Sequence, residues 1–147
     1  MSNTNEMLVE FEAVGENESF ARVVIAAFVT RLNPTLEELG DIKVAVSEAV
    51  TNAIIHGYEE KGGKIRITAR LEENELTVQI EDWGKGIPDV EKAMEPLFTT
   101  KPEEERSGMG FSFMEAFTDE LLVESKPGEG TRVTMKKVMG VQDGSNN

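Results

Sequence analysis

The chain has 147 residues, 39% of them hydrophobic, and it contains no cysteine. This length fits one domain with its own core, and the lack of cysteine excludes disulfide and thiolate chemistry. The 28 acidic and 15 basic residues give a formal charge of −13, a poor match to nucleic acid or an anionic membrane. No apolar run approaches the roughly 18 residues of a membrane span, and residues 1–6 carry no signal pattern. We therefore expect a cytoplasmic protein.

Apolar periodicity divides the chain into helices and strands. In chain order it predicts a strand over 7–13, a helix over 19–32, a helix from Thr35 to about Gly57, strands over 64–71 and 76–80, a short helix over 90–94, a helix over 109–117, and strands over 121–125 and 132–138. Thr35 and Glu38 form a capping box, and Gly40 weakens the turns that follow. Residues 98–107 have little periodicity and indicate a mobile segment, and residues 141–147 indicate a disordered tail.

This order of elements predicts a single α/β domain over residues 1–140, followed by the tail. A strand, two helices, a hairpin, a loop, a helix and a second hairpin favour a two-layer α+β sandwich. We expect one mixed sheet with helices on one of its faces. No internal repeat or low-complexity linker indicates a domain boundary.

Two polar side chains interrupt the apolar pattern of the long second helix. Glu48 and Asn52 are four residues apart, so they project from one face, one above the other. An amide oxygen suits Mg²⁺, which typically sits on substrate phosphates with few protein ligands. A carboxylate one turn away could take a proton from an attacking hydroxyl or water. Taken alone, the pair also fits a solvent-exposed glutamate and an asparagine near a helix end.

A glycine-containing loop, Trp83-Gly84-Lys85-Gly86, follows the second strand of the first hairpin. Its two glycines allow positive φ and close approach of the backbone to a flat ligand. Asp82, at the strand end, could accept a hydrogen bond from an exocyclic amine. The structural alternative is a glycine turn capped by the aspartate.

The segment Gly108-Met109-Gly110 precedes a predicted helix, whose free N–H groups and positive dipole end would suit phosphate oxygens. Lys101 and Arg106, just before it, could close over a terminal phosphate as a lid. The alternatives are a plain helix-start loop and solvated charge.

Two further residues have weaker signals. Thr131 ends the turn 128–131 and could join a hydrogen-bond network at a ligand, although the segment is by default a hairpin turn. His56 is the single histidine. No second metal ligand accompanies it, so we interpret it as a helix-end residue.

The order of these segments resembles that of the Bergerat-fold ATPases, the superfamily of gyrase, Hsp90, the histidine kinases and MutL. Residues 48–57 resemble the N box and residues 82–86 the D-x-G-x-G box. Residues 108–111 resemble the G-x-G-[LF] box and residues 128–131 the last G-x-G-T element. The resemblance covers roughly residues 39–138.

This resemblance implies ATP and Mg²⁺ as ligands, with ATP held between sheet-end loops and helices. Asn52 would bind Mg²⁺, Glu48 would be the general base, and Asp82 would recognise the adenine amino group. The other binding residues implied are Gly84, Gly86 and Thr131 for adenine, and Lys101, Arg106, Gly108, Met109 and Gly110 for the phosphates.

Within the superfamily, the whole chain resembles the small bacterial anti-sigma-factor serine kinases. The compact length and residues 97–102 and 108–115 carry this likeness. It implies a homodimer that holds a sigma factor inactive and phosphorylates a serine of an anti-anti-sigma factor, without direct contact with nucleic acid or membrane. Length and sequence texture favour the sporulation, sigma-F type over the stress-response, sigma-B type.

A second class of function is a non-catalytic, nucleotide-gated binding module. Glu48 discriminates between the two, because a relative that only binds could lose this carboxylate. A histidine kinase is disfavoured, since no separate hairpin with an acceptor histidine is in view.

Overall fold

The computed structural model describes residues 4–95 and 110–141. Its elements are β1 (Thr4–Glu12), α1 (Asn17–Phe28), the 3-10 turn η1 (Val29–Leu32), α2 (Leu36–Asn52), the π-helical turn η2 (Ala53–Gly57), β2 (Lys64–Glu72), β3 (Glu75–Asp82), α3 (Val90–Ala93), α5 (Phe111–Phe117), β4 (Glu120–Lys126) and β5 (Gly130–Val138). The predicted mobile segment over 98–107, with its lid residues Lys101 and Arg106, and residues 142–147 of the predicted tail lie outside the described residues. The predicted strands and helices are otherwise all present, with ends shifted by a few residues.

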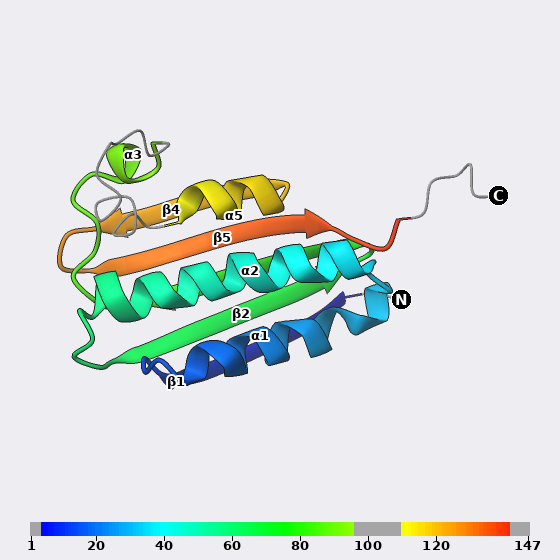
Figure 1. The fold of residues 1–147 in the computed structure, drawn as a ribbon, viewed down its shortest axis with the longest axis horizontal. Coiled ribbons are helices and arrows are strands. Elements are labelled where there is room, and N and C mark those ends of the chain that lie inside the picture. The colour runs from blue at the N-terminus through cyan, green and yellow to red at the C-terminus, as the bar shows by residue number, and fades with distance from the viewer. Residues whose placement is uncertain (1–3, 96–109, 142–147) are drawn as a thin grey trace.

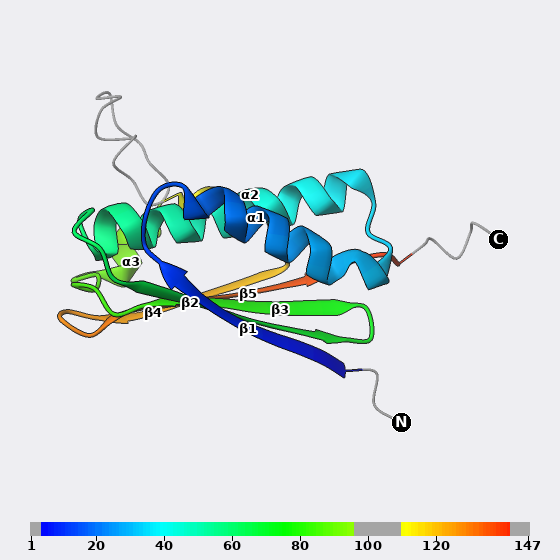
Figure 2. The same ribbon diagram turned by 90° about the horizontal axis from the view of Figure 1, so that it is seen from below.

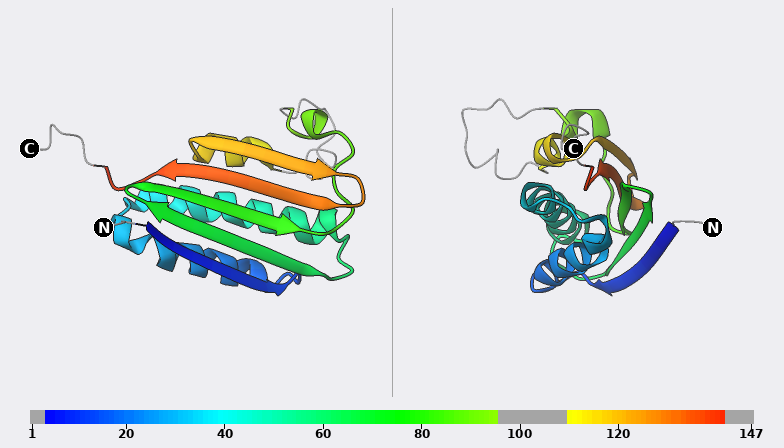
Figure 3. Two further views of the ribbon diagram at one scale, coloured as in Figure 1. Left: turned by 180° about the vertical axis from the view of Figure 1, so that it is seen from behind. Right: turned by 90° about the vertical axis from the view of Figure 1, so that its right-hand side faces the viewer.

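The described strands form one sheet in the order β1-β2-β3-β5-β4. The longer helices α1, α2 and α5 lie side by side on one face of this sheet (Figures 1 and 2), and α2 packs against both α1 and α5. None of the described helices lies on the opposite face (Figure 3). The predicted two-layer α/β architecture is therefore confirmed.

The core lies between the sheet and the helices because the strands alternate. In β2 and β3 every second side chain is buried, among them Ile65, Ile67 and Val78, while their neighbours face solvent. The inner face of α2 buries Ile42 and Val46 against them. Each such burial stabilises the fold by about 1.5–3 kcal/mol.

The sheet corrects one expectation, because every pairing among the described strands is antiparallel rather than mixed. The two helices between β1 and β2 run in opposite directions, so the chain returns to the end of the sheet where β1 stopped (Figure 1). β2 must then run back alongside β1. β5 lies between β3 and β4, so these two strands, which share a direction, are not neighbours.

The second helix begins as predicted and ends differently. The Glu38 N–H donates to Thr35 Oγ1 at 3.0 Å, and the Thr35 N–H donates to Glu38 Oε1 at 2.9 Å, which completes the capping box. At the other end the α-helix gives way to the π-helical turn η2, which no local signal indicates. Single π-helical turns occur often at functional sites. Among the described helices, none is long and apolar enough to cross a membrane.

Candidate functional site

Four of the predicted site residues line one pocket. Asn52 comes from the end of α2, Asp82 from the end of β3, Gly86 from the following loop and Thr131 from the start of β5. The cavity volume of this pocket is about 20 Å³ in this structure, room for roughly one water molecule, so a larger ligand requires the surrounding segments to move apart. Its other lining residues are Ala49, Ala53, His56, Gly57, Ile80, Ile87, Phe111 and Val133. A mostly apolar pocket with a few convergent polar groups is the usual form of a small-molecule site.

Asp82 lines this pocket and is only 7% exposed. Burial raises the pKa of Asp82, and the backbone N–H groups of Gly84 and Thr131 act in the opposite direction. The Gly84 N–H donates to Asp82 Oδ1 at 2.9 Å. An ionised carboxylate with four lone-pair sites keeps acceptor capacity for a ligand amine after accepting these bonds.

Three glycines around Asp82 are required for different reasons. A Cβ at Gly57, which also lines the pocket, would lie 3.0 Å from the Asp82 carboxylate. Gly86 has a φ of +77°, and a Cβ there would clash with the carbonyl of Lys126. Gly84 does not line the pocket, although the resemblance implies that it does. A Cβ at Gly84 would clash with the Gly57 carbonyl, so this glycine lets the loop pack on η2.

The hydroxyl of Thr131 belongs to a hydrogen-bond network with Ser125. Ser125 Oγ accepts from the Ile87 N–H at 2.7 Å and donates to the Gly130 carbonyl at 2.9 Å. Its oxygen lies 2.9 Å from Thr131 Oγ1. Because the single Ser125 proton is already used, the Thr131 hydroxyl is assigned as the donor of this bond. Its oxygen remains an acceptor toward the pocket.

Glu48 is half-buried on α2, one helical turn before Asn52, and lies beside the N-terminus of α5. A Cβ at Gly110, which caps α5 with a φ of +64°, would come within 3.0 Å of Glu48 Oε1. Burial raises the pKa of Glu48, and the nearby Glu18 carboxylate adds to this shift. A carboxylate whose pKa is raised is better suited to take up a proton near neutral pH.

Glu18 is itself held in place from two sides. It accepts a hydrogen bond from Ser47 Oγ on α2 and pairs with Arg22, whose Nε lies 2.9 Å from Glu18 Oε2. The α1–α2 contact therefore places a second carboxylate close to Glu48.

A protein-held metal cluster is absent from the described part of the chain, where no three acidic, histidine or cysteine side chains gather. Mg²⁺ takes most of its ligands from water and substrate phosphates, with one or two from protein. The amide of Asn52, on the pocket wall, fits a cation brought by a nucleotide. Lys101, Arg106, Gly108 and Met109 lie outside the described residues, so their phosphate contacts stay predictions.

Three residues in or next to the pocket were not predicted to be functional. His56 lines the pocket, and burial lowers its pKa, as does the nearby Lys85, so the imidazole is neutral at pH 7. Gly57 lies next to it, within the predicted N box. Ser125 has no local signal, because its contact with Thr131 depends on the pairing of β4 with β5.

Comparison with known proteins places this site in a family. A family model for the histidine kinase-like ATPase domain matches residues 11–137. The anti-sigma F factor of Clostridium acetobutylicum is 59% identical over 133 residues, which cover 90% of this chain and 93% of that protein. The chain therefore belongs to the histidine kinase-like ATPases and, within them, to the anti-sigma F factor family.

Solved structures of low sequence identity share the fold. The RsbU and RsbW domains of a Mycobacterium tuberculosis protein superpose with a TM-score of 0.67 at 20% identity, over 92% of this chain and 32% of that one. The catalytic domain of the histidine kinase ThkA gives a TM-score of 0.55 at 22% identity, over 90% of this chain and 96% of that one.

Proposed function

We propose that the chain is an ATP-dependent protein serine kinase that also acts as an anti-sigma factor. The observation that carries the kinase is the meeting of Asn52, Asp82, Gly86 and Thr131 in one pocket, with Glu48 one helical turn away. Membership of a kinase-like ATPase family supports nucleotide binding in that pocket.

In this proposal the pocket residues bind the adenine end of ATP. Asp82 accepts a hydrogen bond from the exocyclic amine, and Thr131 Oγ1 supports the same edge of the base. Gly86 leaves room for the ring. Asn52 would hold the Mg²⁺ that comes with the phosphates, and this ion would offset the charge that develops on them.

Glu48 acts as the general base. It accepts the proton of a serine hydroxyl while the serine oxygen bonds to the γ-phosphorus and the bond from that phosphorus to the β–γ bridging oxygen breaks. ADP leaves, and the products are phosphoserine and a protonated Glu48. Gly110, with Gly108, Met109 and either Lys101 or Arg106, would hold the γ-phosphoryl group.

The acceptor would approach from the α1 side of α2, where the structure has a second hollow. Val14, Glu18, Thr51 and Ile55 are among the residues that line it. Glu48 is three residues before Thr51, which faces this hollow, and four before Asn52, which faces the pocket. Helical geometry therefore places Glu48 between the pocket proposed for ATP and the hollow proposed for the acceptor serine.

The partners we propose are a sigma factor of the sporulation, sigma-F type and its anti-anti-sigma factor, which would supply the serine. Relatives at 55–59% identity that are named anti-sigma F factor support this choice over a sigma-B type pathway. We also propose that the chain works as a homodimer.

The decisive experiment is phosphate transfer from labelled ATP-Mg²⁺ to a candidate anti-anti-sigma factor. We expect label on a serine with the wild-type chain and none with Glu48→Gln, although both bind ATP. No transfer by a wild-type chain that binds ATP tightly would favour the nucleotide-gated binding module instead.

A further inference from the structure

The side chain of Tyr58 joins three segments of the chain, two of which, η2 and the end of β3, contribute to the pocket. Its hydroxyl donates to the Lys64 carbonyl at 2.6 Å and accepts from the Trp83 N–H at 2.8 Å. Tyr58 directly follows η2, Lys64 begins β2, and Trp83 directly follows Asp82. One hydroxyl thus ties the residue after η2 to the start of β2 and to the residue after Asp82, which lines the pocket.

We propose that Tyr58 is a positioning residue for nucleotide recognition, whose hydroxyl fixes the peptide after Asp82 so that this carboxylate faces the base. The inference rests on the proposed nucleotide site. It adds a residue that the family motifs quoted above do not include, and it assigns a task to the hydroxyl rather than to the ring.

The ring of Tyr58 is seated independently of its hydroxyl. A Cβ at Gly63 would overlap the ring, so the aromatic plane packs directly on a bare glycine backbone. Burial raises the pKa of the Tyr58 phenol, so it remains a donor across the physiological range. Phenylalanine can keep this ring contact, while the Trp83 N–H and the Lys64 carbonyl would each lose their partner.

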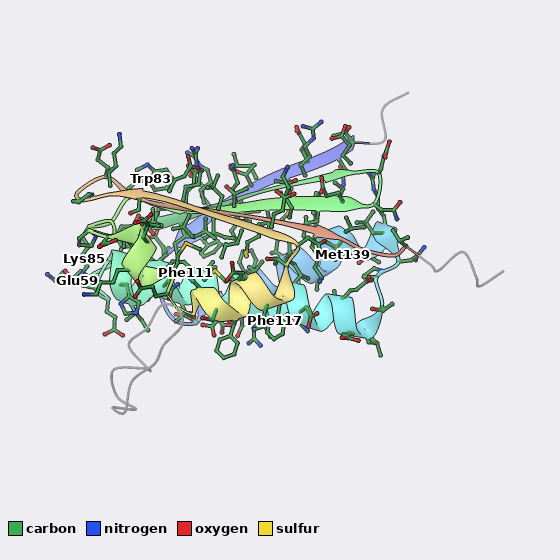
Figure 4. The ribbon with its side chains drawn as sticks, turned by 90° about the horizontal axis from the view of Figure 1, so that it is seen from above. Glu59, Trp83, Lys85, Phe111, Phe117 and Met139 are labelled. Atoms are coloured by element: carbon green, nitrogen blue, oxygen red, sulfur yellow. The ribbon has the colours of Figure 1, made fainter. Side chains whose placement is uncertain are left out.

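The loop that follows Asp82 also contacts η2 without Tyr58. These other contacts show which part of the loop depends on the Tyr58 hydroxyl. The Lys85 N–H donates to the Gly57 carbonyl at 2.9 Å, and the Lys85 ammonium lies 3.2 Å from Glu59 Oε2. Figure 4 shows Glu59, Lys85 and Trp83 at the same end of the molecule. These contacts hold the middle of the loop. The Tyr58 hydroxyl holds the first peptide after Asp82, which sets the direction of that side chain.

The test compares ADP and GDP binding by calorimetry in the full chain with that in Tyr58→Phe. We expect the Kd for ADP to rise about tenfold and the preference for ADP over GDP to fall by a similar factor. Glu59→Gln is the matched control, because it weakens only exposed ion pairs, with Lys85 of the same loop and with Lys61. Both affinities should stay within about twofold in this variant.

Hydrogen exchange provides a readout that does not depend on affinity. In Tyr58→Phe the Trp83 amide should exchange faster, while the Lys85 amide, which is bonded to Gly57, should change little. Loss of stability without loss of the ADP preference would indicate a merely structural residue and would overturn the proposal, as would unchanged binding and exchange. If the wild-type chain failed to bind ADP, the proposed function itself would fall, and this inference with it.

Discussion

At the scale of single residues, the site contains carboxylates whose surroundings favour the neutral form. Asp82 has a raised pKa because of burial, so its ionised form opposes folding at neutral pH. The sign follows from linkage: a folded-state pKa above the unfolded one gives a penalty that is absent at low pH and appears as pH rises. The protein thus keeps an unfavourable charge at the place where a ligand amine would be recognised.

The first prediction concerns Asp82→Asn. The amide keeps the shape and still accepts the Gly84 N–H, but it removes the buried charge. We expect a higher melting temperature of the ligand-free protein at pH 7–8, together with a loss of about 10–100-fold in the preference for ATP over GTP, the worth of one charged hydrogen bond. Calorimetric titration with both nucleotides and thermal unfolding measure the two effects, and an intact ATP preference would refute the adenine role.

The second prediction concerns the pH dependence of transfer. Only ionised Glu48 can accept a proton, and its pKa is raised by burial and by Glu18. The single-turnover rate should therefore fall as pH drops, with a midpoint above the ordinary value of about 4.3 for glutamate. Glu48→Gln should lower the rate about 10²–10⁴-fold and abolish this fall of the rate at acidic pH, the acidic limb of the pH–rate profile.

A second variant tests the cause of the raised pKa. In Glu18→Gln, the acidic limb should move to lower pH, because the neighbouring negative charge is gone. A limb that stayed in place in Glu18→Gln would show that this carboxylate has no influence on the titrating group.

At the scale of elements, α2 combines stability and function along its length. Its first turns carry the capping box, its middle packs in the core, and its end supplies Glu48 and Asn52. Beyond it, η2 brings His56 and Gly57 to the pocket. We therefore expect the proposed function to depend on how this helix ends, and stability to depend on how it begins.

The third prediction tests this division with two glycines. Gly40 lies within α2, and a Cβ there would meet nothing within 4 Å. Gly40→Ala should raise the free energy of unfolding by about 0.5–1 kcal/mol and leave ATP binding unchanged. Gly84→Ala, by contrast, should weaken ATP binding because its Cβ would clash with the Gly57 carbonyl. Urea denaturation and nucleotide titration distinguish the two; equal effects on binding would contradict the division.

At the scale of the whole molecule, the helix-free face of the sheet is lined by charged side chains. On this face Glu10 pairs with Arg66 at 2.6 Å, and Glu12 pairs with Lys64. Exposed pairs of this kind contribute little to stability. β1 is an edge strand, and Leu8 on it is 59% exposed. An edge strand with exposed apolar surface is a place where a second copy could pair.

The fourth prediction places the proposed homodimer at this edge. Leu8→Arg should shift the chain toward monomer in sedimentation velocity experiments, with ATP binding retained, because a two-fold interface would bring two new charges together. Leu122→Arg, on the opposite edge strand β4 and 55% exposed in the wild type, is the matched control. If Leu122→Arg alone gave monomers, the interface would lie at the other edge.

The sequence by itself determined the main helices and strands, their order and the family, but not the π-helical turn η2. Alternation in residues 64–71 and the Thr35–Glu38 capping box are local signals, because they depend on side chains a few residues apart. Four short boxes in the family's order predicted that Asn52, Asp82 and Thr131 belong to one site. The fold places these three residues in one pocket.

Only the tertiary structure decided how the strands pair and what surrounds the predicted residues. The antiparallel register sets Asp82 opposite Thr131, and the pairing of β4 with β5 brings Ser125 to the Thr131 hydroxyl. Packing of α1 and α5 on α2 puts Glu18 and Gly110 beside Glu48. These contacts join residues that are far apart in the chain, so the periodicity of the sequence does not predict them. Their energies depend on burial and on neighbouring charge, which exist only once the chain has folded.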